Sequence, residues 1–136
     1  MGDGASEHAL EFLLDFDGRI HLLEKGYWLK FEIKRVLRTE ARPHGLSYSF
    51  TLHAPDGVRL VGFDNAHRVP LKGSRFKRRR RTFDHWHRTG KDHGQPYDFK
   101  NAETFLDDFF DEVERVLSKG GIETVVVGVE DKGRNR

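Results

Sequence analysis

The sequence predicts an α+β fold, with an antiparallel β-sheet of about five strands and one main C-terminal helix packed on one face. Two patterns indicate this class. In the first half, apolar and polar residues alternate in short runs, as in strands with one buried and one wet face. Near the C-terminus, residues 102–118 carry apolar residues at helical spacing. Because domains usually run to about 100–150 residues, the chain, 1–136, is expected to form a single domain.

An antiparallel meander is expected over about residues 8–64. Turn signals separate its alternating runs: Asp17-Gly18 follows the first, Arg42-Pro43-His44-Gly45 follows the third, and Pro55-Asp56-Gly57 joins the last two into a hairpin. The runs are residues 10–16, 20–22, 27–33, 46–52 and 58–63. Each run is predicted to form a strand.

The segment from about residue 66 to 99 is predicted to be a long basic, histidine-containing loop that leaves the sheet. It shows little periodicity, and four Gly or Pro residues interrupt it. Loops of this length in a compact domain are usually functional or disordered. A short strand is predicted within residues 82–88.

The main helix is predicted over residues 102–118. Asn101 can cap its first N–H groups, and the carboxylate of Glu103 suits the positive end of the helix dipole. Gly120-Gly121 is expected to end it. Residues 122–130 are rich in β-branched valine and are predicted to form a last strand, at a sheet edge or a partner surface.

The charge of the chain is segregated. The formal net charge is only +2, but residues 67–93 contain ten basic and two acidic side chains, which gives that stretch +8 and leaves −6 on the rest.

The lack of cysteine excludes disulfides, thiolate metal sites and a cysteine nucleophile. No apolar run approaches the ~20 residues that span a bilayer, and residues 1–7 lack a secretory pattern, so we expect a cytoplasmic protein without membrane contact.

The basic stretch contains a block of six positive charges in seven residues. Such a block repels itself unless it is solvated or neutralised, and phosphate backbones neutralise it through guanidinium contacts and counterion release. We therefore expect nucleic acid as its ligand. Plain solvation, an acidic protein partner or the chain's own acidic helix face are the alternatives. The predicted nucleic-acid-binding residues are Arg75, Lys77, Arg78, Arg79, Arg80 and Arg81.

Two histidines follow this block. In an extended segment His85 and His87 share one face, and Arg88 is next in the chain. Metal-free RNA cleavage needs a base for the 2′-hydroxyl proton, an acid for the leaving 5′-oxygen and a cation for the phosphorane, and these residues match the three roles. If the two imidazoles are too close for in-line chemistry, His44 or His67 is the candidate for the second proton transfer.

Two other interpretations of these histidines stay open. With one further imidazole or carboxylate, the His-x-His pair would offer nitrogen and oxygen ligands for zinc or manganese. The candidates for this further ligand are His67, Asp64 and Asp84. The histidines could also be bland surface or structural residues. Acid/base chemistry or phosphate contact is preferred, so no metal and no cofactor is predicted.

Polar residues gather at the two ends of the predicted hairpin. If the segment 46–63 pairs about Asp56-Gly57, its two ends are neighbours in space. Ordinary turn chemistry explains these residues about as well as a functional site does. The residues expected to cluster there are His44, Asp64, Asn65 and His67.

Six stretches carry a family resemblance when they are taken in order. They are Tyr27-Trp28-Leu29-Lys30-Phe31-Glu32, Arg42-Pro43-His44-Gly45-Leu46-Ser47-Tyr48-Ser49, Gly62-Phe63-Asp64-Asn65-Ala66-His67, Asp84-His85-Trp86-His87-Arg88, Pro96-Tyr97 and Phe105-Leu106-Asp107-Asp108-Phe109. The chain thereby resembles the TumE-type toxin family of bacterial and archaeal toxin–antitoxin modules over roughly Gly26 to Leu117. The arginine run and the valine-rich tail depart from the family pattern. The resemblance implies a small toxin whose partner is a helix-turn-helix antitoxin made beside it.

The leading hypothesis is a toxin that acts on RNA, in preference to DNA, as a metal-independent endoribonuclease with histidine acid/base chemistry. Small toxins of this size are often ribonucleases, which is an argument by association. The alternatives are a non-catalytic nucleic-acid-binding or regulatory module and a metal-dependent nuclease. A homodimer stays open. A partner or the basic segment is expected to contact the acidic helix face, which comprises Asp107, Asp108, Asp111 and Glu114.

Overall fold

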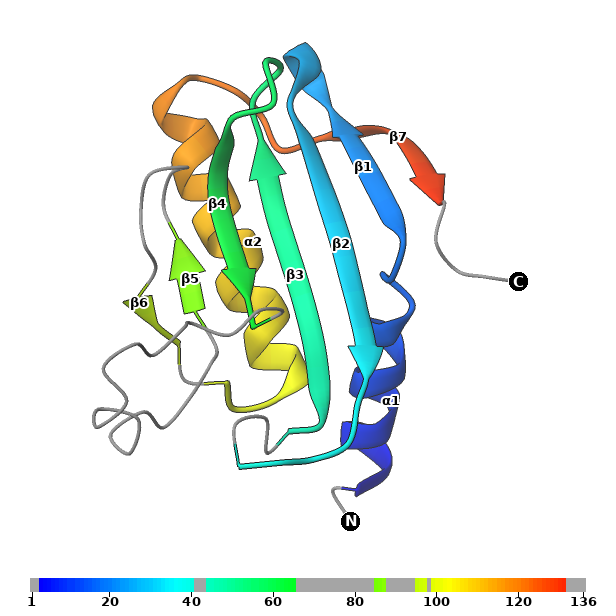
Figure 1. Ribbon diagram of the computed structural model, residues 1–136. Helices are drawn as coiled ribbons and strands as arrows, with labels where there is room; N and C mark the ends of the chain where they lie inside the picture. The colour runs from blue at the N-terminus through cyan, green and yellow to red at the C-terminus, as the bar shows by residue number, and fades with distance from the viewer. Residues whose placement is uncertain (1–2, 41–43, 66–84, 88–94, 98, 132–136) are drawn as a thin grey trace.

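The structure, a computed structural model, describes residues 3–40, 44–65, 85–87, 95–97 and 99–131, with the backbone alone for 3–7, 85–87 and 95–96. In this part of the chain, seven strands form one antiparallel sheet in the order β6-β5-β4-β3-β2-β1-β7, and two α-helices cover one face (Figure 1). The elements are α1 (Asp3–Leu14), β1 (Arg19–Leu23), a 3₁₀ turn (Glu24–Gly26), β2 (Trp28–Arg35), β3 (Leu46–His53), β4 (Arg59–Asp64), β5 (His85–His87), β6 (Gln95–Pro96), α2 (Ala102–Lys119) and β7 (Val126–Asp131).

The predicted α+β class is confirmed. Five of the strands have five or more residues, while β5 and β6 have three and two. The short strand predicted within residues 82–88 is present as β5. Gln95–Pro96, also within the predicted basic loop of about residues 66–99, forms the short strand β6. Residues 66–84, 88–94 and 98 of that loop lie outside the described residues.

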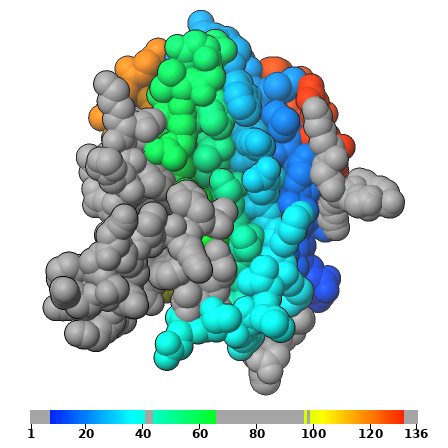
Figure 2. Space-filling model, in the orientation of Figure 1, coloured from blue at the N-terminus to red at the C-terminus, as the bar shows by residue number. Residues whose placement is uncertain are grey.

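The strict alternation of β2 and β3 divides the sheet into a buried and an open face. Phe31 pairs with Phe50 in the register, and both side chains are fully buried beneath the helices. Lys30 and Glu32, one residue to either side, are exposed on the opposite face. Burial of the alternating aromatic and aliphatic side chains therefore holds the sheet against the helices and leaves a polar open face, the face seen in Figure 2.

Helix α2 forms where its periodicity predicts it. The side chain of Asn101 accepts a hydrogen bond from the Thr104 N–H at 2.8 Å, which caps the first turn. Phe105 and Phe109 are fully buried, and their rings pack edge-on against sheet rings, such as Phe63 at 5.7 Å from Phe109. At the other end, Gly121 takes φ +72°, which a glycine adopts without strain.

The prediction of a strand over residues 10–16 is wrong, because these residues belong to helix α1 and the turn after it. The two-residue spacing of Leu10, Phe12, Leu14 and Phe16 coexists with a helical spacing, and tertiary packing selects the helical one. Leu13 and Phe16 are buried under the sheet, whereas Phe12 is 59% exposed. The antiparallel meander therefore begins at Arg19 and not near residue 8.

The last strand starts later than predicted, at Val126 and not at residue 122. Ile122 is buried, and its N–H bonds to the carbonyl of Leu117 at 2.9 Å, so it closes the end of α2. Among the described strands, β7 pairs with β1 alone, which confirms the expected sheet edge. Its valines remain exposed, Val127 to 62%.

Candidate functional site on the open face of the sheet

Strand β5 joins the sheet beside β4, and this pairing positions the two predicted catalytic histidines. His85 pairs with Asp64, Trp86 with Phe63 and His87 with Gly62. Phe63 is buried under α2, so Asp64 and Gly62, its neighbours along β4, belong to the open face. Because cross-strand partners share a face, the register positions of His85 and His87 lie on the open face as well.

A buried carboxylate occupies the position opposite His85. Asp64 is only 6% exposed although it lies on the polar face, and its second cross-strand partner is Ser49 on β3. A carboxylate is seldom buried this deeply without a structural or chemical reason. Directly opposed residues in a sheet have Cβ atoms about 4.5–5.5 Å apart, so a carboxylate here is within reach of an imidazole at position 85.

An arginine covers the position opposite His87. The β3–β4 ladder shifts register between Leu52 and His53, so that His53 pairs with Arg59. Such a bulge changes the direction in which a side chain points. A Cβ atom added to Gly62 would lie 3.1 Å from Cδ and 3.5 Å from Nε of Arg59, which shows that the arginine side chain crosses Gly62. No sequence pattern signals this cation, because it is the bulge that brings Arg59 beside the glycine.

A stacked aromatic pair extends the same face. The His53 ring stacks on Trp28 at 4.1 Å and 11°. Its Nδ1 donates to the Gly57 carbonyl at 3.1 Å, which leaves Nε2 to accept from the Thr51 hydroxyl at 2.9 Å. Burial lowers the pKa of His53, the nearby charges of Lys30 and Arg59 lower it further, and the Gly57 hydrogen bond opposes them. His53 is therefore a neutral imidazole at neutral pH. The only signal of this pair in the sequence is Trp28, an aromatic residue among the polar positions of its strand.

His44 and Asn65 meet at one end of the sheet. The Nδ1 of His44 accepts the Leu46 N–H at 3.1 Å, and the Asn65 side chain donates to the Leu46 carbonyl at 2.9 Å. The His44 ring packs 4.5 Å from the Phe99 ring, which lies against Phe105 of α2. His44 thus lies on the helix side of the sheet, whereas Asp64 lies on the open face.

Asn65 continues the β3–β4 pairing beyond the last residue of β4. Its Oδ1 accepts the Tyr48 N–H at 2.8 Å, and its own N–H donates to the Tyr48 carbonyl at 3.0 Å. Asn65 is fully buried, so these bonds satisfy backbone groups that water does not reach. Its role in the described structure is to hold the start of β3, at Leu46 and Tyr48, next to the site.

Several predicted site residues lie outside the described residues. They are His67, Arg75, Lys77, Arg78, Arg79, Arg80, Arg81 and Arg88. Within the described part of the chain, no group of three or more His, Asp or Glu side chains is arranged to hold a metal ion. None of the described helices is long and apolar enough to cross a membrane.

The fold and this face define a small α+β protein whose open sheet surface combines histidine, carboxylate and arginine. A model of the TumE toxin family matches residues 7–117 of the chain. The chain therefore belongs to the TumE family of toxins, which confirms the resemblance and implies a cognate antitoxin as partner. None of the curated proteins and none of the solved structures compared with the chain matches it.

Proposed function

We propose that this toxin cleaves RNA as a metal-independent endoribonuclease at the junction of β4 and β5. The observation that carries the proposal is the register of this junction, which sets His85 opposite the buried Asp64 and His87 opposite the glycine crossed by Arg59. Two groups able to transfer protons, a carboxylate and a cation are thereby available on one face. Groups of these types gathered in one place are typical of catalytic sites.

The chemistry assigns one proton transfer to each histidine. One imidazole takes the proton from a 2′-hydroxyl, whose oxygen then bonds to the adjacent phosphorus. The bond from phosphorus to the 5′-oxygen breaks, and the second imidazole gives that oxygen its proton. Residues two apart on a strand are separated by ~6.6 Å, which leaves room for a phosphate between the two rings. The products are a 2′,3′-cyclic phosphate and a 5′-hydroxyl.

Neighbouring residues take supporting roles. Asp64 is proposed as a positioning residue that holds the imidazole of His85, while Arg59 and Arg88 stabilise the charge that develops on the phosphorane. If a single imidazole on β5 acts alone, His67 supplies the other proton transfer. His44 is the weaker candidate for that role, because it packs on the helix side of the sheet.

Substrate binding is assigned to the basic run. Its last residue, Arg81, precedes β5 by only four positions in the sequence, so the run leads directly into the site. Guanidinium groups bind phosphates in a bidentate manner and release counterions, which suits an RNA backbone. Because the nucleophile is a 2′-hydroxyl, RNA is the substrate, whereas DNA can compete for binding but is not cleaved. The run comprises Arg75, Lys77, Arg78, Arg79, Arg80 and Arg81.

The helix-turn-helix antitoxin made beside the toxin would suppress this activity in the cytoplasm.

The test uses the purified full chain and a labelled RNA oligonucleotide, with a matched oligonucleotide that is 2′-deoxy throughout. We expect cyclic-phosphate products from the RNA alone, unchanged by EDTA. A His85→Ala/His87→Ala double variant should lose at least about 100-fold in rate, as expected for loss of acid/base catalysis. The control is His8→Ala/His21→Gln, which changes two histidines that lie away from β5.

Three results would overturn the proposal. Cleavage abolished by EDTA would indicate a metal-dependent nuclease. Salt-sensitive RNA binding without product on any RNA would indicate a non-catalytic binding module. Full cleavage by the double variant would remove the histidines from the mechanism.

A further inference from the structure

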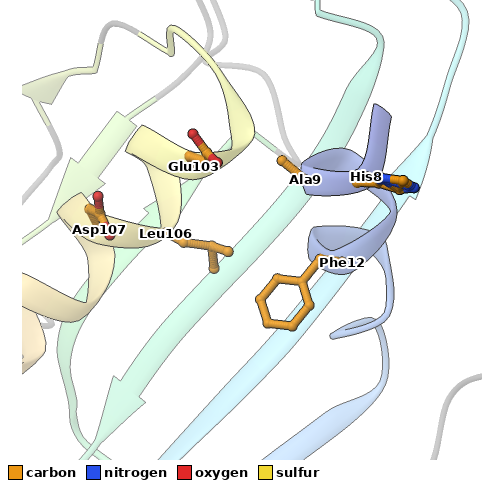
Figure 3. A pocket seen from close by; sticks show the side chains of 6 residues that line it. All are labelled: His8, Ala9, Phe12, Glu103, Leu106 and Asp107. Carbon is orange, nitrogen blue, oxygen red and sulfur yellow. The ribbon is translucent and has the colours of Figure 1, made fainter. Parts of the chain in front are cut away.

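Helices α1 and α2 lie on the side of the sheet away from the open face (Figure 1). A groove runs between them, and Figure 3 shows the side chains that line it. It has a volume of about 600 Å³. Figure 3 shows Phe12 of α1 and Leu106 of α2 pointing toward each other across the gap. The groove is lined by His8, Ala9, Phe12, Glu103, Leu106 and Asp107.

The floor of the groove is apolar and open to solvent. Phe12 is 59% exposed, even though its ring touches Phe16 edge-on at 5.5 Å, and Leu106 is only partly buried. A single exposed phenylalanine needs no explanation. A phenylalanine that faces a leucine and an alanine across two helices is different, because the three line one concave apolar surface that a ligand can cover.

The rim of the groove is acidic. Glu103 and Asp107 lie on α2 beside Leu106, and both are exposed. The acidic character continues along the same helix through the exposed Asp111 and Glu114. Among the described residues that line the groove there is no lysine and no arginine. An occupant must therefore bring apolar groups for the floor and positive charges for the rim.

We infer that this groove binds a basic amphipathic helix of the cognate antitoxin. Two neighbouring helices present the ridges and the groove into which a third helix packs, with apolar anchors one turn apart. Lysine or arginine residues that flank these anchors would meet Glu103 and Asp107. The inference rests on membership in a toxin family, which implies an antitoxin, and is independent of the RNA cleavage proposed above.

The chain's own arginine run does not suit this groove. Residues 75–81 carry six positive charges and a single apolar side chain, Phe76. They can neutralise the rim, but they lack the second apolar residue, three or four positions away, with which a helix covers a floor of this kind. A partner that combines both features fits the groove better.

The test measures binding of the purified antitoxin, encoded beside the toxin, by titration calorimetry with the full-length toxin. Phe12→Glu places a charge on the floor, and Glu103→Gln/Asp107→Asn removes the rim charges while retaining the shape of the side chains. We expect the Kd to rise at least tenfold for the first variant and to lose most of its salt dependence in the second. Co-expression should show that Phe12→Glu still arrests growth and is no longer neutralised.

Matched controls keep the result specific to the groove. Leu37→Glu introduces the same charge at an apolar side chain that is 85% exposed after β2. Glu40→Gln/Glu123→Gln removes two exposed carboxylates that lie outside both the groove lining and helix α2. Both controls should bind antitoxin as the wild type does. Unchanged affinity for Phe12→Glu, together with loss of binding for Val127→Lys on the exposed edge strand β7, would overturn the inference and transfer the antitoxin site to that edge. Because binding is measured without RNA, a toxin that cleaves no RNA would leave this test unaffected.

Discussion

His85 and Asp64 are direct cross-strand partners in the antiparallel pairing of β5 with β4. The pairing joins a short strand, which follows the basic run in the sequence, to a strand whose residues are largely buried. It also places a carboxylate opposite a histidine position that lies 21 residues later in the chain.

Asp64→Asn should lower kcat for RNA cleavage by about tenfold or more, because the amide no longer holds the imidazole of His85 in its productive orientation. KM should change little, since Asp64 does not contact the substrate in this scheme. Steady-state kinetics on the labelled RNA measure both constants. Ser49→Ala is the control, because it changes the other cross-strand partner of Asp64. Wild-type kcat in the Asp64→Asn variant would exclude the positioning role.

Gly62→Ala should disturb the position of Arg59 with little effect on the fold. The added Cβ would lie 3.1 Å from Arg59 Cδ, and the flexible arginine side chain must move away from it. We expect the free energy of unfolding to change by less than about 1 kcal/mol, because alanine also restricts the unfolded chain. Cleavage should nevertheless fall several-fold.

Two comparisons decide whether Arg59 causes that fall. Gly128→Ala places a similar contact, 3.3 Å from Leu22, on the remote strand β7, and it should leave cleavage unchanged. Arg59→Ala should reproduce the loss seen for Gly62→Ala. If Arg59→Ala cleaves at the wild-type rate, the phosphate is stabilised by another cation.

Asn65→Ala should destabilise the protein by about 2–4 kcal/mol. The substitution removes the side-chain partners of the Tyr48 N–H and the Leu46 carbonyl, and each buried group left without a partner costs about 1–3 kcal/mol. Urea unfolding measures the loss. Asn101→Ala is the comparison, since removal of a helix cap typically costs only about 1 kcal/mol. Equal losses for the two variants would argue against the special role of Asn65 at the start of β3.

Stability should decrease as the pH falls through 6.5. Burial lowers the pKa of His21, to which the Arg19 charge adds, and burial lowers the pKa of His53 as well. Between the usual value of 6.5 and the lowered value in the folded state, the unfolded chain binds more protons, so acid favours unfolding. The contribution is complete above pH 6.5 and is lost progressively below it.

Urea midpoints measured at several pH values across this window test the effect. A His21→Gln/His53→Gln variant should show a shallower decrease than the wild type, whereas His8→Gln, at an exposed position of α1, should not. A double variant with the wild-type slope would show that other groups cause the acid sensitivity.

Long, regular patterns were predictable from the sequence. The alternation of β2 and β3 continues through Phe31 and Phe50, and the helical spacing of α2 continues from Phe105 to Leu117, so each pattern fits only one type of element. The seven residues from Leu10 to Phe16 were not predictable in this way. Their spacing suits both a strand and a helix, and the burial of Leu13 and Phe16 decides for the helix.

The sequence by itself determined the α+β class, the main helix with its cap, the open and buried faces of the central strands, and the His-x-His segment as the candidate site. Only the tertiary structure decided what lies around that site. The register of β5 against β4 brings in Asp64, and the bulge in the β3–β4 ladder brings in Arg59. The physical reason is that local patterns arise from the period of a single element, whereas register and bulges arise from contacts between residues distant in the chain.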